Sequence, residues 1–254
     1  MRLNPPASLS LLLVLNMSVL LSSLQGQNTL TVAAASDLSP LEGVLREAFP
    51  EIGFNFTFAS SGVLARQIEN GAPFDVYLSA SEEFMNQLVK KRKVVKEEVQ
   101  VYAIGRLGLW SKSGAVRTLN DLTQPGVKLI AVANPQLAPY GAAAVAAIRK
   151  AGLYERVQPM LVYGENIRQT QQFVETGNAE VGILAWSMIF DKGGYLIPDD
   201  LHPPIRQVVA PIRRKGGNLK LAEQFIQALL SEKGRSIFAR HGFNLLPPPP
   251  SLRR

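Results

Sequence analysis

The sequence predicts an α/β fold built as two lobes, each a mostly parallel sheet flanked by helices. Short runs rich in β-branched and aromatic residues alternate with segments that carry apolar residues at helical spacing, which is typical of βαβ units. This alternation occurs once in each half of the chain. The 254 residues, 46% hydrophobic and 19% charged, suffice for one large domain or two small lobes.

The first series of elements begins at residue 30. Phe54, Phe56 and Phe58 alternate with polar residues, as in a half-buried strand. Gly71 and Pro73 are typical of the end of a helix. We therefore expect strands at residues 30–35, 54–59 and 75–79, and helices at residues 38–49, 63–70 and 82–91.

The second series repeats this order and is followed by elements that need a sheet to cover. We expect strands at residues 129–133, 160–163 and 181–185, helices at 141–151 and 167–176, a strand at 205–210, and helices at about 219–230 and 232–240. The economical arrangement crosses between the lobes twice, near residues 105 and 209. The first lobe would then comprise residues 27–105 and 209–246, the second would comprise 106–208, and a Pro-rich tail would occupy 247–254.

The N-terminus has the pattern of a secretory signal peptide. Arg2 is its only charge, and an apolar run over residues 9–21 precedes small residues that end at Gly26. A transmembrane anchor is the alternative, but polar residues interrupt the run before it reaches about 20 apolar positions. We expect cleavage after residues 1–26 and a soluble, exported product.

The composition excludes several kinds of site. The sequence has no cysteine, which rules out disulfides, thiolate metal sites and cysteine nucleophiles, and two histidines are too few for a histidine metal cluster. The net charge is +7, with one dense basic run at residues 90–96. No aromatic residues interleave with that run, so we interpret it as a solvated helix face and expect no nucleic-acid binding.

The expected strand ends are the informative feature. Four strands run directly into small hydroxyl residues or into the starts of helices, at residues 36–37, 60–62, 134–141 and 164–167. Helix starts present unpaired N–H groups and a partial positive charge, which favour an anion. Serine and asparagine at such positions are also common helix caps, so capping and anion binding both remain open at this point. For the first helix, a capping box from Ser39 to Glu42 would leave the Ser36 hydroxyl free.

Several motifs resemble those of the periplasmic molybdate-binding proteins of ABC transporters, and the resemblance runs in order over residues 28–245. They are Ala33-Ala34-Ala35-Ser36, Phe58-Ala59-Ser60-Ser61-Gly62, Gly71-Ala72-Pro73-Phe74-Asp75, Ala138-Pro139-Tyr140-Gly141, Glu165-Asn166-Ile167 and Thr176-Gly177-Asn178-Ala179-Glu180.

The resemblance implies a two-lobed periplasmic-binding-protein fold of type II that closes on a dehydrated molybdate or tungstate oxyanion. Such a protein is a periplasmic monomer that delivers its ligand to the membrane permease of an ABC importer; it is not an enzyme and has no cofactor. Molybdenum would be held within the oxyanion and not as a free cation. The residues that match ligand positions are Ser36 and Ser61, as hydroxyl and N–H donors, and Asp37, Tyr140 and Ile167, through their backbone N–H groups.

Two positions depart from the pattern that this family shows. Some members place a tyrosine hydroxyl on the ligand where this chain has Ala185. Position 37 is commonly neutral, and an ionised Asp37 beside a dianion is unfavourable, so we expect the helix dipole to hold its carboxylate outward. An inward carboxylate would instead favour hydrogenphosphate, whose OH group needs an acceptor.

Two other classes of function remain as alternatives. One is a binding protein for sulfate, phosphate or an organic acid; an organic carboxylate usually requires a bidentate arginine, for which Arg168 is the candidate. The other is an exported serine hydrolase that uses Ser61 or Ser36 with His241 or His202. The sequence contains no Gly-x-Ser-x-Gly motif, which disfavours the hydrolase.

Overall fold

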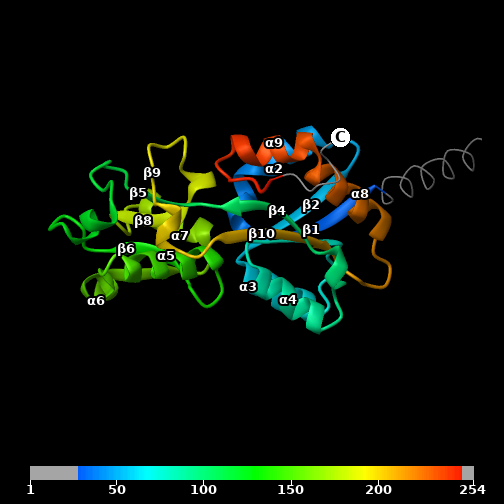
Figure 1. Cartoon of the computed structure of the whole chain (residues 1–254), viewed down its shortest axis with the longest axis horizontal. Helices are drawn as coiled ribbons and strands as arrows, with labels where there is room; N and C mark the ends of the chain where they lie inside the picture. The colour runs from blue at the N-terminus through cyan, green and yellow to red at the C-terminus, as the bar shows by residue number, and fades with distance from the viewer. Residues whose placement is uncertain (1–27, 248–254) are drawn as a thin grey trace, which may run out of the picture.

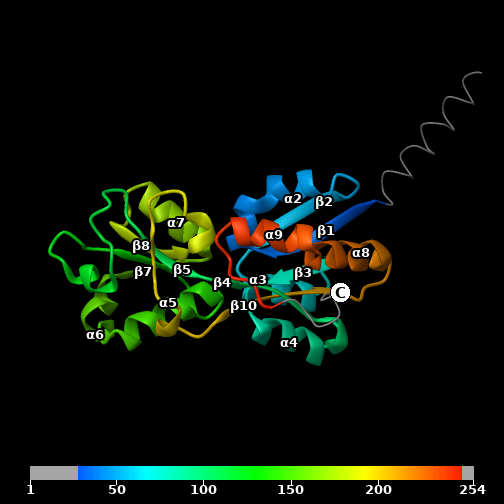
Figure 2. The ribbon, with the colours of Figure 1, turned by 45° about the horizontal axis from the view of Figure 1, so that its top comes forward.

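A computed structural model describes residues 28–247 of the chain. The expected signal peptide at residues 1–26 lies outside the described residues, as does the expected tail beyond residue 247. The predicted α/β fold with two lobes is confirmed. The described residues form two five-stranded sheets, each flanked by helices, which lie side by side in Figures 1 and 2.

The first lobe is built on a sheet with the strand order β2-β1-β3-β10-β4. Its strands are β1 (Thr29–Ala35), β2 (Gly53–Ala59), β3 (Val76–Ser79), β4 (Gln100–Gly105) and β10 (Ile205–Pro211). β1 pairs in parallel with β2 and β3, whereas β10 is antiparallel to both of its neighbours. The parallel part is therefore the N-terminal half of the lobe.

The second lobe has the strand order β7-β6-β8-β5-β9. Its strands are β5 (Leu107–Trp110), β6 (Ile130–Ala133), β7 (Leu161–Gly164), β8 (Val181–Ala185) and β9 (Tyr195–Leu196). β6 pairs in parallel with β7 and β8, and β5 is antiparallel to β8 and β9. The two sheets thus share one design: a parallel group at one side and antiparallel strands at the other.

Helices cover both faces of the first sheet, with α2, α8 and α9 on one face and α3 and α4 on the other (Figure 1). Val32 packs with the first group and Ala33 with the second, which explains why β1 is apolar throughout. The helices of the two lobes are α2 (Glu42–Ala48), α3 (Ser61–Glu69), α4 (Glu82–Lys90), α5 (Pro139–Lys150), α6 (Tyr154–Val157), α7 (Ile167–Glu175), α8 (Leu219–Leu230) and α9 (Glu232–Arg240).

The expected helix at residues 38–49 is in fact two elements. A 3₁₀ helix, η1 (Ser36–Leu41), leads directly into α2, and neither has a side-chain cap, so the predicted capping box at Ser39 is wrong. The physical reason is that the chain is already helical from Ser36. The Glu42 N–H bonds the Ser39 carbonyl inside this continuous turn, and no separate helix start remains to be capped.

The chain passes between the lobes at two neighbouring places. Only Arg106 separates β4 of the first sheet from β5 of the second. The return crossing precedes Ile205, because β10 pairs with β4 from its first residue, Ile205, which lies opposite Gly105. The expected boundary at residue 209 falls inside β10 and is too late in the chain.

None of the helices within residues 28–247 combines the length and hydrophobicity that a bilayer span requires.

The C-terminal helices should contribute strongly to the stability of the first lobe. Phe225 of α8 is fully buried, and its ring lies 5.8 Å from that of Phe49 and 5.0 Å from that of Phe54. Phe225→Ala should lower the free energy of unfolding by about 3–5 kcal/mol, measured by urea denaturation. Phe190→Ala, at a position 36% exposed, is the control and should cost much less. Equal losses would contradict this account of the core.

Candidate anion-binding site

In the first lobe, the register of two parallel strands brings the candidate residues together. Ala35 of β1 lies opposite Ala59 of β2, so Ser36 and Ser60 leave the sheet at the same edge. Ser36, Ser60 and Ser61 are all buried, with exposures of 3%, 3% and 0%. Three serines from segments more than twenty positions apart in the sequence therefore lie at one edge.

The second lobe repeats this arrangement. Ala133 of β6 lies opposite Gly164 of β7, and these strand ends lead to α5 and α7. A Cβ on Gly141 would collide with the carbonyl of Ala133, so glycine is required for the start of α5 to approach the end of β6. Tyr140 and Ile167, at the starts of the two helices, are both buried.

Ser61 begins α3 and is held by two hydrogen bonds. Its Oγ accepts from the Ala80 N–H at 3.1 Å, and its carbonyl accepts from the Tyr77 hydroxyl at 2.7 Å. Burial raises the pKa of Tyr77 above its ordinary value, so this hydroxyl remains a donor. The Ser61 Oγ uses a lone pair in the bond from Ala80, and its hydroxyl proton can be donated to another acceptor.

Ser60 is a candidate that sequence reasoning missed. The motif match assigns Ser61 to the ligand and gives Ser60 no role. Ser60 stands at the N-cap of α3 but makes no capping hydrogen bond, and its Oγ is buried without a partner in the part of the chain that the structure describes. Capping, the alternative function for this residue, is therefore absent here, and a buried hydroxyl without a partner is costly unless something else accepts from it.

The backbone donors of the second lobe occupy the first positions of their helices. Asn166 caps α7 by accepting from the N–H groups of Arg168 and Gln169 at 3.0 and 3.1 Å, which leaves the Ile167 N–H outside the cap. In α5, Pro139 stands first and has no N–H, so Tyr140 supplies the first one. N–H groups at these positions have no acceptor within their own helix.

Asp37 does not point outward as expected from the helix dipole. It is 1% exposed, and its Oδ2 accepts from the Tyr140 hydroxyl at 2.9 Å and from Gln207 Nε2 at 2.7 Å. Two direct donors outweigh the dipole of the short helical segment that begins at Ser36, which explains the inward orientation. Its Oδ1 is buried without a partner among the described residues, and burial raises the pKa of Asp37 to about 6 despite these hydrogen bonds.

Four hydrogen bonds join the lobes at or beside these residues. Tyr140 donates to the Asp37 carboxylate and accepts from Gln207 Nε2 at 3.2 Å, Ser187 Oγ donates to the Asp37 carbonyl at 3.0 Å, and the Gly62 N–H donates to the Leu137 carbonyl at 2.9 Å. The edge that carries Ser36 and Ser61 therefore faces the edge that carries Tyr140, and the lobes are closed on each other.

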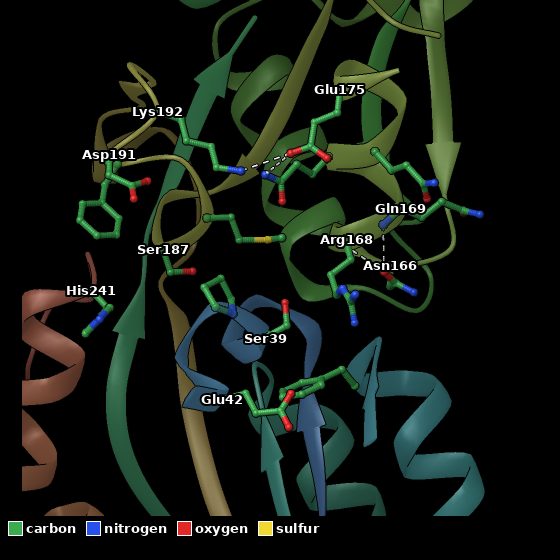
Figure 3. Close-up of a pocket in the computed structure, with 16 residues that line it drawn as sticks. Ser39, Glu42, Asn166, Arg168, Gln169, Glu175, Ser187, Asp191, Lys192 and His241 are labelled. Carbon is green, nitrogen blue, oxygen red and sulfur yellow. Dashed lines mark hydrogen bonds and ion pairs between the residues drawn. The ribbon is translucent and has the colours of Figure 1, made fainter. Parts of the chain in front are cut away.

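An open groove of about 890 Å³ follows the outer side of this contact, between η1, α7 and residues 187–192, with His241 at the end of α9 (Figure 3). None of the five predicted site residues lines it, since they are buried. Arg168, the candidate ligand for an organic carboxylate, extends from α7 into the groove on the side of Ser39 and Glu42 (Figure 3). The arginine is thus part of the groove and not of the buried set.

The two histidines of the described residues contact backbone carbonyls. Nδ1 of His202 contacts the carbonyl of Pro203 and Nδ1 of His241 contacts the carbonyl of Ile237, and neither ring bonds a serine hydroxyl within residues 28–247. Over the same residues, no group of three or more His, Cys, Asp or Glu side chains is placed to hold a metal ion. What the facing edges do offer is a set of hydroxyl and N–H donors, which suits an anion.

Residues 30–244 match the family described as bacterial extracellular solute-binding proteins. The chain belongs to this family. A molybdate-binding protein of Azotobacter vinelandii is 35% identical over 94% of this chain and 98% of its own length, and one of Rhodobacter capsulatus is 33% identical over 84% and 90%. The solved structure of a periplasmic molybdate-binding protein of Azotobacter vinelandii superposes with a TM-score of 0.79, at 27% identity, over 86% of this chain and 99% of that one.

The raised pKa of Asp37 in this solute-binding protein predicts a stability that depends on pH. Between the ordinary pKa of 3.8 and the folded value of about 6, the folded protein holds a proton that the unfolded chain releases. The free energy of unfolding therefore falls as pH rises through this window, by up to about 3 kcal/mol at 1.36 kcal/mol per pKa unit.

Asp37→Asn removes this titration while keeping an acceptor for Tyr140 and Gln207. The free energy of unfolding of the unaltered protein, minus that of Asp37→Asn, should fall as the pH is raised from 4 to 7. Urea denaturation at four pH values in this range measures the difference. Parallel pH profiles for the two proteins would show that the Asp37 carboxyl titrates normally.

Proposed function

We propose that this chain binds molybdate or tungstate in the periplasm and delivers it to the membrane permease of an ABC importer. The observation that carries the proposal is the set of buried donors at the two facing edges. Ser36, Ser61 and the N–H of Asp37 belong to the first lobe, and the N–H groups of Tyr140 and Ile167 belong to the second. The relatives named as molybdate-binding proteins, which match nearly the whole chain, support the same ligand.

The chemistry of the donor set fits a tetrahedral dianion. Molybdate carries no proton at neutral pH, so each of its oxygens is an acceptor and a site made of donors satisfies it. Hydrogen bonds to a charged group are about twice as strong as neutral ones, and the starts of α3, α5 and α7 add a partial positive charge. Donors from both lobes would couple ligand capture to closure of the cleft.

Hydrogenphosphate is the second candidate, and one observation favours it. The Oδ1 atom of Asp37 is buried without a partner in residues 28–247, and an ionised carboxylate accepts hydrogen bonds but cannot donate them. The OH group of hydrogenphosphate could donate to this oxygen, whereas an unprotonated dianion would be repelled by it. Protonation of Asp37 at Oδ1 would remove that repulsion and leave Oδ2 to accept from Tyr140.

A calorimetric panel tests these ligands against each other. Molybdate and tungstate should bind at pH 7.5 with similar affinity, because they are alike in size and charge, and sulfate and phosphate should bind at least tenfold more weakly. A preference for phosphate would make Asp37 an acceptor for the ligand and overturn the molybdate assignment. Absence of binding by all four would remove the oxyanion proposal altogether.

Ser61→Ala should raise the dissociation constant for molybdate by about tenfold to a hundredfold, since hydrogen bonds to charged groups contribute about 1.5–3 kcal/mol. Ser60→Ala should leave the melting temperature of the ligand-free protein unchanged or higher, because it removes a buried hydroxyl that has no partner in the described residues. If Ser60 also donates to the ligand, its replacement will weaken binding as well. Ser113→Ala, on the exposed surface of the second lobe, is the control.

The Ser61 assignment fails if Ser61→Ala binds molybdate as tightly as the unaltered protein while its melting temperature falls. That result would mean that the hydroxyl serves only to hold the Ala80 N–H.

A further inference from the structure

Four buried polar side chains form a continuous hydrogen-bonded chain across the lobe contact. The Tyr102 hydroxyl of β4 donates to Gln207 Oε1 of β10 at 3.0 Å, and Gln207 Nε2 donates to Asp37 Oδ2 at 2.7 Å. The Tyr140 hydroxyl of α5 donates to the same oxygen at 2.9 Å. All four residues are 3% exposed or less. The chain thus connects both crossing strands to the start of α5.

Only Tyr140 in this group belongs to the second lobe. Because Gln207 Oε1 accepts from Tyr102, its Nε2 faces Asp37 and Tyr140 and donates to both, so the first lobe supplies a donor to the carboxylate that does not depend on Tyr140. Burial beside Asp37 raises the pKa of the Tyr140 hydroxyl well above its ordinary value, which keeps it protonated and able to donate. The two bonds of the Tyr140 hydroxyl, donated to Asp37 and accepted from Gln207 Nε2 at 3.2 Å, are therefore the ones that break when the lobes separate.

Gly105, where the chain crosses between the lobes, leaves room for the Tyr140 hydroxyl. A Cβ on Gly105 would overlap the Tyr140 hydroxyl oxygen and would lie 3.0 Å from its Cζ and 3.0 Å from Gln207 Nε2. Gly105 ends β4 opposite Ile205, where both crossing strands meet. Its backbone is outside the left-handed region, so the glycine is required for space and not for conformation.

We propose that the Tyr140 side chain is a latch that holds the closed state, seated against Gly105 and bonded to Asp37. This role is separate from that of the Tyr140 backbone N–H, which the proposed function assigns to the oxyanion, and the ligand readout below rests on that function. A contact made only in the closed state stabilises the bound complex after encounter. It slows ligand dissociation and leaves the association rate nearly unchanged.

Two substitutions test the latch without touching the backbone donor. Tyr140→Phe removes only the hydroxyl, and Gly105→Ala blocks its seat. Each should raise the dissociation rate constant of molybdate by about tenfold or more, equivalent to about 1.4 kcal/mol, with an association rate within about twofold of the unaltered protein. Stopped-flow fluorescence measures both rates. Gly43→Ala, with no atom within 4 Å of the new Cβ, and Tyr163→Phe, at a position 45% exposed, are the matched controls.

Small-angle scattering gives a readout that a purely structural role would not change. The radius of gyration with saturating molybdate should be larger for Gly105→Ala than for the unaltered protein. A double-mutant cycle of Tyr140→Phe with Asp37→Asn should show coupling in the dissociation rate, because Tyr140→Phe removes the donor of this bond and Asp37→Asn replaces its charged acceptor by a neutral one. Tyr140→Phe keeps the proposal testable if Gly105→Ala does not fold.

The outcomes separate the latch from the proposed function. One outcome is that the unaltered protein binds molybdate while both variants release it at the same rate as the unaltered protein and have the same radius of gyration. In that case the latch is wrong and the proposed function stands. If the unaltered protein binds none of the oxyanions, the proposed function fails. The latch is then judged by scattering alone: a Gly105→Ala protein no larger than the unaltered one would overturn it.

Discussion

The register of two parallel strand pairs is the constraint on which the candidate site depends. Ala35 lies opposite Ala59 in the first lobe, and Ala133 lies opposite Gly164 in the second. Each pairing delivers two chain segments to one sheet edge, and each segment then turns into a helix whose first N–H groups lack acceptors. A shift in either register would separate the donors, and closure of the lobes would no longer bring four strand ends together.

Asp37 differs from the other residues of the site because its buried side chain is a carboxylate, which accepts hydrogen bonds and is costly to bury. Removing an ionised group from water costs several kcal/mol unless donors compensate for it, and here the tyrosine of one lobe and Gln207 of the other supply two. The compensation is partial, because Oδ1 is buried without a partner in the described chain. The same group therefore stabilises lobe contact through one oxygen and leaves the other available to influence which anion is bound.

Periodicity predicted most strands and helices, and its failures have identifiable causes. The strands β4 and β5 were not predicted, because one residue separates them and no pattern in the sequence shows that they belong to different sheets. The boundary at residue 209 failed for a related reason: a strand at residues 205–210 was expected, but only its pairing with β3 and β4 shows that the whole strand belongs to the first sheet. Ser39 resembles a cap in sequence, but the 3₁₀ turn that begins at Ser36 makes a cap unnecessary.

The sequence by itself determined the features that depend on neighbouring residues: a serine at the start of α3, an asparagine at the start of α7, and the order of most strands and helices in each lobe. Only the tertiary structure decided the inward orientation of Asp37, the contact between Tyr140 and Asp37, and the space at Gly105. The partners of Asp37 lie 103 and 170 positions away in the chain. The bond to Gln207 follows from the packing of the first lobe and the bond to Tyr140 from how the lobes close, and no local spacing of residues encodes either.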